Sequence, residues 1–259
     1  MTAPLVLVHR DPDVLAQAVA ARLVTHLVDA QAAAGSANIV LTGGGIGVAA
    51  LAALGASPAR GAVDWSRLDV WWGDERFLPS GHADRNETQA RAALLDPVRM
   101  PSHRVHAMPA SDGPDGPDPE AAAARYAAEL ESAARPEHHG PVPAFDLLLL
   151  GVGPDGHTAS LFPELAGVHD ERPVVAVRGA PKPPSTRISL GFSALNAARD
   201  VWFVVAGADK AGAVALALAG AGRSQVPAAG VHGRRRTLWL LDRAAAAGLP
   251  PSLARIASP

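Results

Sequence analysis

The stretch that decides the fold is residues 145–163, which read FDLLLLGVGPDGHTASLFP. Its first six residues are mostly apolar, which is typical of a strand buried on both faces of a parallel sheet. Three glycines and a proline then end the strand and predict a loop, and residues 158–160 favour the start of a helix. The loop carries an acid, Asp155, and an imidazole, His157. Because ligands of open α/β sheets bind outside the carboxyl ends of the strands, we expect the chemistry here.

The glycines of this loop also match the dinucleotide-binding pattern GxGxxG, but the residues between them argue against a nucleotide. Asp155 would set a carboxylate against the pyrophosphate, and Pro154 removes one of the N–H donors that such a site uses. The acidic residue expected about 20 positions further on is also missing, because Asp170 and Glu171 come too early. We therefore interpret the glycines as the support of Asp155 and His157.

The composition of the whole chain excludes several classes of protein. Its 259 residues carry a formal net charge of -2, which argues against a nucleic acid or an anionic membrane as partner. The absence of cysteine excludes disulfides, thiolate metal sites and a cysteine nucleophile, and it fits a reducing cytosol. Residues 1–9 lack the basic region of a signal peptide, and the longest apolar run, residues 211–222, is too short to span a membrane. We expect a soluble, cytoplasmic protein.

Strand patterns alternate with helix patterns along the chain, without a repeat or a compositional break. Helices are expected after most strands, and the last of them is predicted from Asp242 through Ala247. This alternation predicts an α/β fold with one doubly wound, mainly parallel sheet flanked by helices, in a single domain over residues 1–259. The predicted strands are residues 5–9, 38–41, 68–72, 145–150, 173–177, 186–190, 200–207 and 237–241.

Glycines and lysines indicate an anion site. Residues 42–47, TGGGIG, connect a predicted strand to a predicted helix, where backbone N–H groups can face an anion. The alternative is a tight connection without a ligand. Of the 23 basic residues only Lys182 and Lys210 are lysines, and for Lys182 chance is the alternative explanation. Lys210 opens a predicted helix, where a cation opposes the helix dipole unless an anion is bound.

Charged residues also follow the strand at 68–72. Asp74, Glu75 and Arg76 come in a row, so we do not expect them in the core. They form either a solvated turn or part of the same sheet edge as His157. Two histidine pairs lack nearby carboxylates at ligand spacing and are predicted to be solvated: His103 with His106, and His138 with His139.

With these motifs in view, the chain resembles 6-phosphogluconolactonases over nearly its whole length. The run from Asp155 to Pro163 is the most specific piece. Glucosamine-6-phosphate deaminases have a similar glycine-histidine loop, but there the histidine is typically followed by Ile-Ala-Phe-Asn-Glu-Pro, and the loop after the third strand has Asp-Glu-Tyr. The chain departs from the lactonase pattern Ser-Gly-Gly-Ser-Thr-Pro, because Gly45 replaces a hydroxyl and Gly47 replaces a helix-starting proline. The matching pieces, in the expected order, are residues 41–45, 71–77, Asn86, 151–163, 182–190, 207–211 and 239–242.

The resemblance implies hydrolysis of 6-phospho-D-glucono-1,5-lactone to 6-phosphogluconate in the oxidative pentose phosphate pathway, without a metal or an organic cofactor. It also implies a modified Rossmann-like fold, as in glucosamine-6-phosphate deaminases. The expected partner is a small phosphosugar lactone, with no nucleic acid and no membrane, and the expected state is a monomer or weak homo-oligomer. Two alternatives remain: a glucosamine-6-phosphate deaminase or isomerase-type enzyme, and a non-enzymatic phosphosugar-binding effector domain.

The same resemblance suggests roles for individual residues. His157 would take a proton from water as the general base, and Asp155 would orient the imidazole. Arg76 would donate to the oxyanion or hold Asp155, and Asp74 would position Arg76. Phosphate binding falls to Gly43, Gly44, Gly45, Arg187 and Lys210, with Lys182 as a helper.

Overall fold

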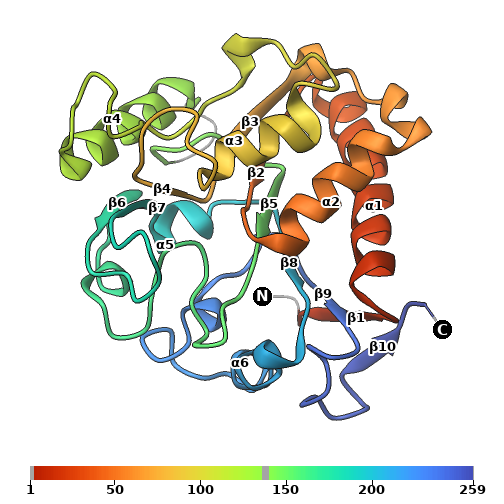
Figure 1. The fold of residues 1–259 in the computed structure, drawn as a ribbon. Coiled ribbons are helices and arrows are strands. Elements are labelled where there is room, and N and C mark those ends of the chain that lie inside the picture. The colour runs from red at the N-terminus through yellow and green to blue at the C-terminus, as the bar shows by residue number, and fades with distance from the viewer. Residues whose placement is uncertain (1–2, 136–139, 259) are drawn as a thin grey trace.

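The computed structural model describes residues 3–135 and 140–258, and at the centre of these residues lies a seven-stranded sheet (Figure 1). Its strand order is β10-β1-β9-β8-β5-β2-β3, and every pairing in it is parallel. The prediction of an α/β fold with a mainly parallel sheet is therefore confirmed. The strands are β1 (Leu5–His9), β2 (Ala37–Leu41), β3 (Leu68–Trp72), β5 (Leu147–Leu150), β8 (Asp200–Val205), β9 (Arg236–Asp242) and β10 (Ala254–Ile256).

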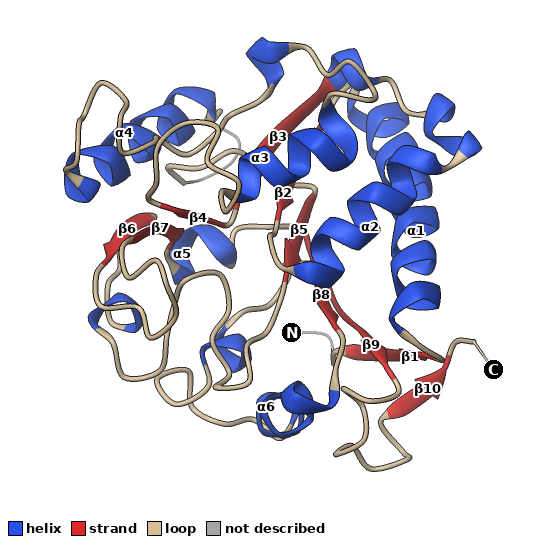
Figure 2. Cartoon of the chain, viewed as in Figure 1, coloured by secondary structure: helices blue, strands red, loops and turns tan. Residues whose placement is uncertain are grey.

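Helices flank this sheet, and the longest of them shows why its sequence is helical. Asp11 caps α1 by accepting a hydrogen bond from the backbone N–H of Val14 at 2.8 Å, with Pro12 at the first helical position. Its buried leucines and valines recur every four residues, and the helix ends at Gly35 with φ 80°. α1 packs beside α2 (Figures 1 and 2). The helices are α1 (Pro12–Ala34), α2 (Gly45–Ala56), α3 (Asn86–Ala90), α4 (Pro119–Ala133), α5 (Phe192–Leu195) and α6 (Ala211–Leu218).

A second, antiparallel sheet lies beside the first and completes the architecture. It has the order β4-β7-β6, formed by β4 (Asp74–Arg76), β7 (Arg187–Leu190) and β6 (Val174–Val177), and α4 packs on β6 and β7. The backbone N–H of Leu190 donates to the carbonyl of Gly73 at 2.8 Å, which ties this sheet to the end of β3. Two of its strands match predicted strands, whereas β4 was not expected.

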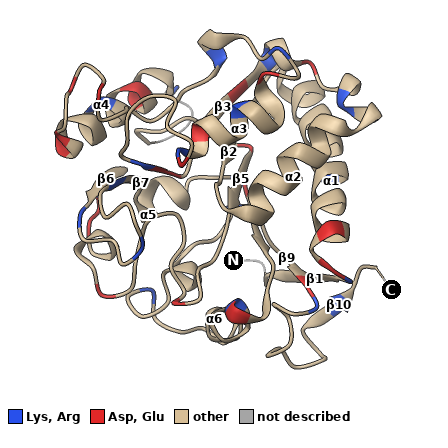
Figure 3. Cartoon of the chain, viewed as in Figure 1, with Lys and Arg blue, Asp and Glu red and all other residues tan. Residues whose placement is uncertain are grey.

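The core is formed by the parallel strands and by large aromatic side chains. All four residues of β5 are buried, as expected for a strand covered on both faces. Trp71, Trp202 and Phe203 are also buried, in other strands of the same sheet. Charged residues of both signs are intermixed along loops and helix ends (Figure 3). Across the described residues, no helix is long and apolar enough to cross a bilayer.

Two predicted helices are wrong. β9 continues through Asp242, and residues 243–248 are turns rather than a helix. The carboxylate of Asp242 accepts hydrogen bonds from the backbone N–H groups of Gly207 and Ala245 at 3.1 and 2.7 Å, and these contacts favour a turn at this point. The segment after His157 is also a tight turn, because Thr158 and Leu161 pair with each other.

The prediction for His106 is wrong as well, because carboxylates distant in the sequence surround it. Its ring stacks on Trp71 at 3.8 Å between centroids and bonds to Asp69 at 3.2 Å and Glu129 at 2.7 Å. Burial alone would lower the pKa of His106, but these hydrogen bonds and charges outweigh burial and raise the pKa to about 9. His103 is exposed, as predicted, and His138 and His139 lie outside the described residues.

Candidate active site

A cavity of about 520 Å³ opens at the carboxyl ends of β2, β5 and β8. Its walls come from the segments that follow these strands, residues 42–46 and 151–154, and from the end of β8, residues 204–206. This is the edge at which a parallel sheet is expected to bind its ligand. The cavity is therefore the candidate active site.

His157 lines this cavity, and Asp155 fixes its ring. Nδ1 of the imidazole lies 2.5 Å from Oδ1 of Asp155, which leaves Nε2 as the ring nitrogen that can meet a substrate. Burial alone would raise the pKa of Asp155, but the hydrogen bond and charge of His157, with backbone N–H groups, outweigh burial and lower it below its usual value. The ring also packs on Phe162 at 4.4 Å between centroids.

The glycines of the loop make room for this pair. A Cβ at Gly153 would lie 2.1 Å from the His157 ring and 2.6 Å from the Asp155 carboxylate, so no other residue fits there. The N–H of Gly153 donates to the carbonyl of His157 at 2.9 Å, and the N–H of Gly156 donates to the carbonyl of Gly153 at 2.9 Å. Gly156 adopts φ 84°, which favours glycine. The interpretation that this loop supports Asp155 and His157 agrees with its geometry.

The first glycine turn lies at another wall of the cavity, with Gly43, Gly44 and Gly45 all in the lining. It leads into α2, whose N-cap is Gly44 at φ 84° and whose first turn has no side-chain cap. Uncapped N–H groups at a helix N-terminus attract anions. A Cβ at Gly45 would have nothing within 4 Å, whereas one at Gly43 would collide with the Asn86 amide. The turn is open at Gly45 and packed at Gly43.

The three charged residues of β4 point to two different faces, because successive side chains of a strand alternate between its faces. Asp74 and Arg76 line the cavity, while Glu75 is 1% exposed in the core. The expectation that all three avoid the core is therefore wrong for Glu75. Its carboxylate accepts from the backbone N–H groups of Arg76, Asn86 and Glu87 at 2.7–2.9 Å, next to the Arg85 guanidinium. Burial nevertheless raises the pKa of Glu75 to about 7.

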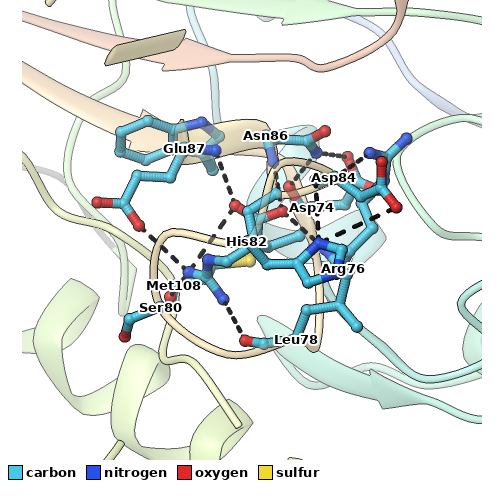
Figure 4. Close-up of polar contacts among 12 residues, drawn as sticks. Asp74, Arg76, Leu78, Ser80, His82, Asp84, Asn86, Glu87 and Met108 are labelled. Carbon is cyan, nitrogen blue, oxygen red and sulfur yellow. Dashed lines mark hydrogen bonds and ion pairs between the residues drawn. The ribbon is translucent and has the colours of Figure 1, made fainter. Parts of the chain in front are cut away.

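Arg76 and Asp74 do not contact each other in the expected way. Nη1 of Arg76 donates to the carbonyl of Asp84 at 2.5 Å (Figure 4). Within the described residues, no hydrogen bond or ion pair joins Arg76 to Asp74 or Asp155. The Asp74 carboxylate instead accepts from Ser160 at 2.7 Å and from the Asn86 amide at 3.4 Å. The Arg76 guanidinium is therefore held at the cavity by a backbone carbonyl and not by a carboxylate.

Three further cations of the cavity are the predicted phosphate ligands Arg187, Lys182 and Lys210. Arg187 is 5% exposed, and it donates to the carbonyls of Lys182 and Pro184 at 2.9 and 3.2 Å. Burial lowers the pKa of Arg187, and the nearby charge of Asp74 opposes this shift. Lys210 is the N-cap of α6, as predicted, and its ammonium pairs with Asp209 at 2.7 Å. Together with Arg76, these cations make the cavity attractive to an anion.

Sequence reasoning about the site missed two polar residues, Asn86 and Ser160. Asn86 lines the cavity, Ser160 is 1% exposed beside it, and both hold Asp74. Both belong to the matching pieces of the family, which is the signal that could have singled them out. No group of three or more His, Cys, Asp or Glu side chains placed to hold a metal ion occurs in residues 3–135 and 140–258.

Comparison with known proteins assigns the chain to a family. Residues 10–239 match the family model described as glucosamine-6-phosphate isomerases/6-phosphogluconolactonase. A 6-phosphogluconolactonase of Streptomyces coelicolor is 64% identical over 251 residues, 96% of each chain. One of Mycobacterium tuberculosis is 50% identical over 241 residues, covering 93% of this chain and 96% of the relative. The solved 6-phosphogluconolactonase of Trypanosoma brucei is 28% identical with a TM-score of 0.80, covering 96% of this chain and all of the other. The chain therefore belongs to the glucosamine-6-phosphate isomerase/6-phosphogluconolactonase family.

Proposed function

We propose that this chain hydrolyses 6-phospho-D-glucono-1,5-lactone to 6-phosphogluconate, a step of the oxidative pentose phosphate pathway, in the cytoplasm. The observation that carries the proposal is the His157–Asp155 pair on a cavity that also contains four cationic side chains. A base is needed to activate water, and cations are needed to hold a phosphate. The names of the relatives in Streptomyces coelicolor and Mycobacterium tuberculosis support the same reaction.

In the proposed mechanism, His157 acts first as a base and then as an acid. Nε2 takes a proton from a water molecule while the water oxygen bonds to the lactone carbonyl carbon. Asp155 holds Nδ1 and stabilises the imidazolium that forms. When the bond between the carbonyl carbon and the ring oxygen breaks, the imidazolium returns its proton to that ring oxygen. Arg76 donates to the oxyanion of the tetrahedral intermediate.

The phosphate would be held away from the reacting carbon. The N–H groups at Gly43, Gly44 and Gly45 offer donors at the start of α2. Lys210, Lys182 and Arg187 supply positive charge from other sides of the cavity. Because the phosphate does not change during hydrolysis, these groups bind substrate and transition state alike, so they affect KM more than kcat.

The test is a pH-stat assay on freshly made lactone, corrected for its spontaneous hydrolysis. The His157→Ala variant is expected to lose at least about 100-fold in kcat, the order of magnitude for loss of a general base. The matched control is His169→Ala, since His169 is exposed and lies outside the cavity lining. Turnover of His157→Ala near that of the control would contradict the assignment of the base.

A deaminase or isomerase of the same family is the second candidate, because Asp74 lies in the cavity where a carbon base would act. Both carboxylate oxygens of Asp74 already accept hydrogen bonds from Ser160 and Asn86, which makes it a poor base. Ammonia release from glucosamine 6-phosphate, exceeding lactone hydrolysis, would favour this candidate. A non-enzymatic effector domain would bind 6-phosphogluconate equally well with and without His157 and would turn over neither substrate.

A further inference from the structure

The cavity contains a hydrogen bond that the proposed reaction does not use directly. Asp74 is 7% exposed, and a carboxylate so buried needs donors. The hydroxyl of Ser160 donates to Oδ2 of Asp74 at 2.7 Å, the ordinary distance of an O–H···O hydrogen bond. The side-chain amide of Asn86 also donates to the backbone carbonyl of Asp74 at 2.9 Å (Figure 4). The Ser160–Asp74 bond joins the histidine loop to β4.

Ser160 lies in a turn that needs external support. Thr158 and Leu161 close the turn with backbone hydrogen bonds of 3.4 and 3.0 Å. Between them Ala159 adopts φ 49°, a left-handed conformation that costs a residue with a side chain about 1 kcal/mol or more. Such conformations persist when the surroundings fix them. Groups outside the turn therefore have to hold it in this conformation.

The N–H and the hydroxyl of Ser160 attach the turn to the small sheet. Its N–H donates to Oγ of Ser189 at 3.1 Å, and its hydroxyl donates to Asp74. Asp74 and Ser189 are themselves partners in the pairing of β4 with β7. Ser160 is thus fixed to one paired position of that sheet, at two points, by bonds buried from solvent.

The turn at residues 158–161 also supports the imidazole of His157. His157 directly precedes it, and Phe162, on which the ring packs, directly follows it. A shift of the turn would move the ring and its support together. We propose that Ser160 is a positioning residue, which holds Nε2 of His157 in place through its hydrogen bond to Asp74. The rate readout of this proposal rests on the proposed hydrolysis, whereas the spectroscopic readout does not.

The first measurement compares Ser160→Ala with a control that loses a buried hydroxyl elsewhere. The control is Thr237→Val, because Thr237 is 6% exposed and accepts from the N–H of Gly233 at 3.0 Å near the amino end of β9. Ser160→Ala should lower kcat for the lactone roughly 10- to 100-fold with KM within about twofold, as expected for a displaced catalytic group. Thr237→Val should lower Tm without lowering kcat.

The second measurement follows the His157 N–H bonded to Asp155 as a low-field proton resonance, assigned by its loss in His157→Ala. Ser160→Ala should shift or broaden this resonance, and Thr237→Val should leave it unchanged. An unchanged resonance in Ser160→Ala overturns the proposal, whatever happens to kcat. If the wild type does not hydrolyse the lactone while the resonance still responds to Ser160→Ala, the proposed function fails and the positioning role stands.

A second variant covers the case in which Ser160→Ala does not fold. Ser160→Cys keeps a donor of similar size, and a thiol is a weaker donor than a hydroxyl. It should give an intermediate kcat and a smaller shift of the His157 resonance. Wild-type kcat together with an unshifted resonance in Ser160→Cys would overturn the proposal.

Discussion

The two glycine turns of the cavity look alike in sequence and differ in what their glycines do. The turn after β2 has Gly43, Gly44 and Gly45, and at Gly45 the space beside the backbone is open. In the turn after β5, the space beside Gly153 is filled by the side chains of His157 and Asp155. One turn therefore leaves its backbone open to the cavity, and the other leaves room for the side chains of His157 and Asp155.

This difference shows that a glycine pattern alone does not identify an anion site. What separates the two turns is the identity of the residues between and after the glycines. An acid and an imidazole follow the second turn and occupy the space that its glycines leave. In the first turn no charged side chain does so, and a helix N-terminus follows.

The largest effect is expected from the substitution Gly153→Ala, which fills the space beside the second turn. A Cβ 2.1 Å from the His157 ring must displace the imidazole or Asp155, so we expect kcat to fall by at least about 100-fold, as for loss of the base. The control is Gly212→Ala in α6, where a Cβ meets nothing within 4 Å. A Gly153→Ala enzyme with the kcat of this control would show that the loop adapts and that its glycine is not needed.

The Asp155→Asn variant tests the hydrogen bond between Asp155 and His157 that the second turn holds. We expect kcat to fall roughly 10- to 100-fold, because the amide does not stabilise the imidazolium. The pKa of Asp155 is lowered in the folded protein, so its ionised form stabilises the fold above the ordinary carboxylate pKa of about 4. That contribution is lost as pH falls through the lowered pKa.

Urea unfolding at pH 7 and pH 3 measures this effect. The wild type should be more stable than Asp155→Asn at pH 7, and the difference should shrink at pH 3. A difference that does not change between the two pH values would show that the Asp155 charge does not stabilise the fold.

The Lys210→Ala variant tests the proposed binding of the substrate phosphate near the first turn. Loss of one charged hydrogen bond to phosphate should raise KM about tenfold and leave kcat nearly unchanged. Competitive inhibition by inorganic phosphate should weaken by a similar factor, which separates phosphate binding from recognition of the sugar. A fall in kcat at constant KM would place Lys210 in the chemistry instead.

The smallest effect is expected from Gly45→Ser in the open turn. The position has room for a side chain, and a hydroxyl there adds a hydrogen-bond donor at the start of α2. We expect KM to fall by roughly two- to fivefold, about the value of one neutral hydrogen bond, with kcat unchanged. A tenfold rise in KM would show that this turn, like the second one, has no space to spare.

Local patterns predicted most of the parallel sheet, because buried strands and their terminating glycines leave a strong signal in the sequence. They also identified cavity residues of several segments, among them His157 and Lys210. They did not predict the burial of Glu75, two of whose three backbone donors come from the start of α3. Nor did they find the surroundings of His106, which depend on Asp69 and Glu129 in other elements. What was missed is polar contact between residues far apart in the chain.

The position of β1 in the sheet affects the order in which the strands of the chain can pair during folding. Its two neighbours are β9 and β10, which contain residues 236–242 and 254–256. During synthesis the first strand therefore has no sheet partner until almost the whole chain has been made. The strands that bear both glycine turns pair among themselves, in the order β8-β5-β2-β3. This part of the sheet can therefore form before β1 is paired. Such long-range closure is typically a slow step of folding.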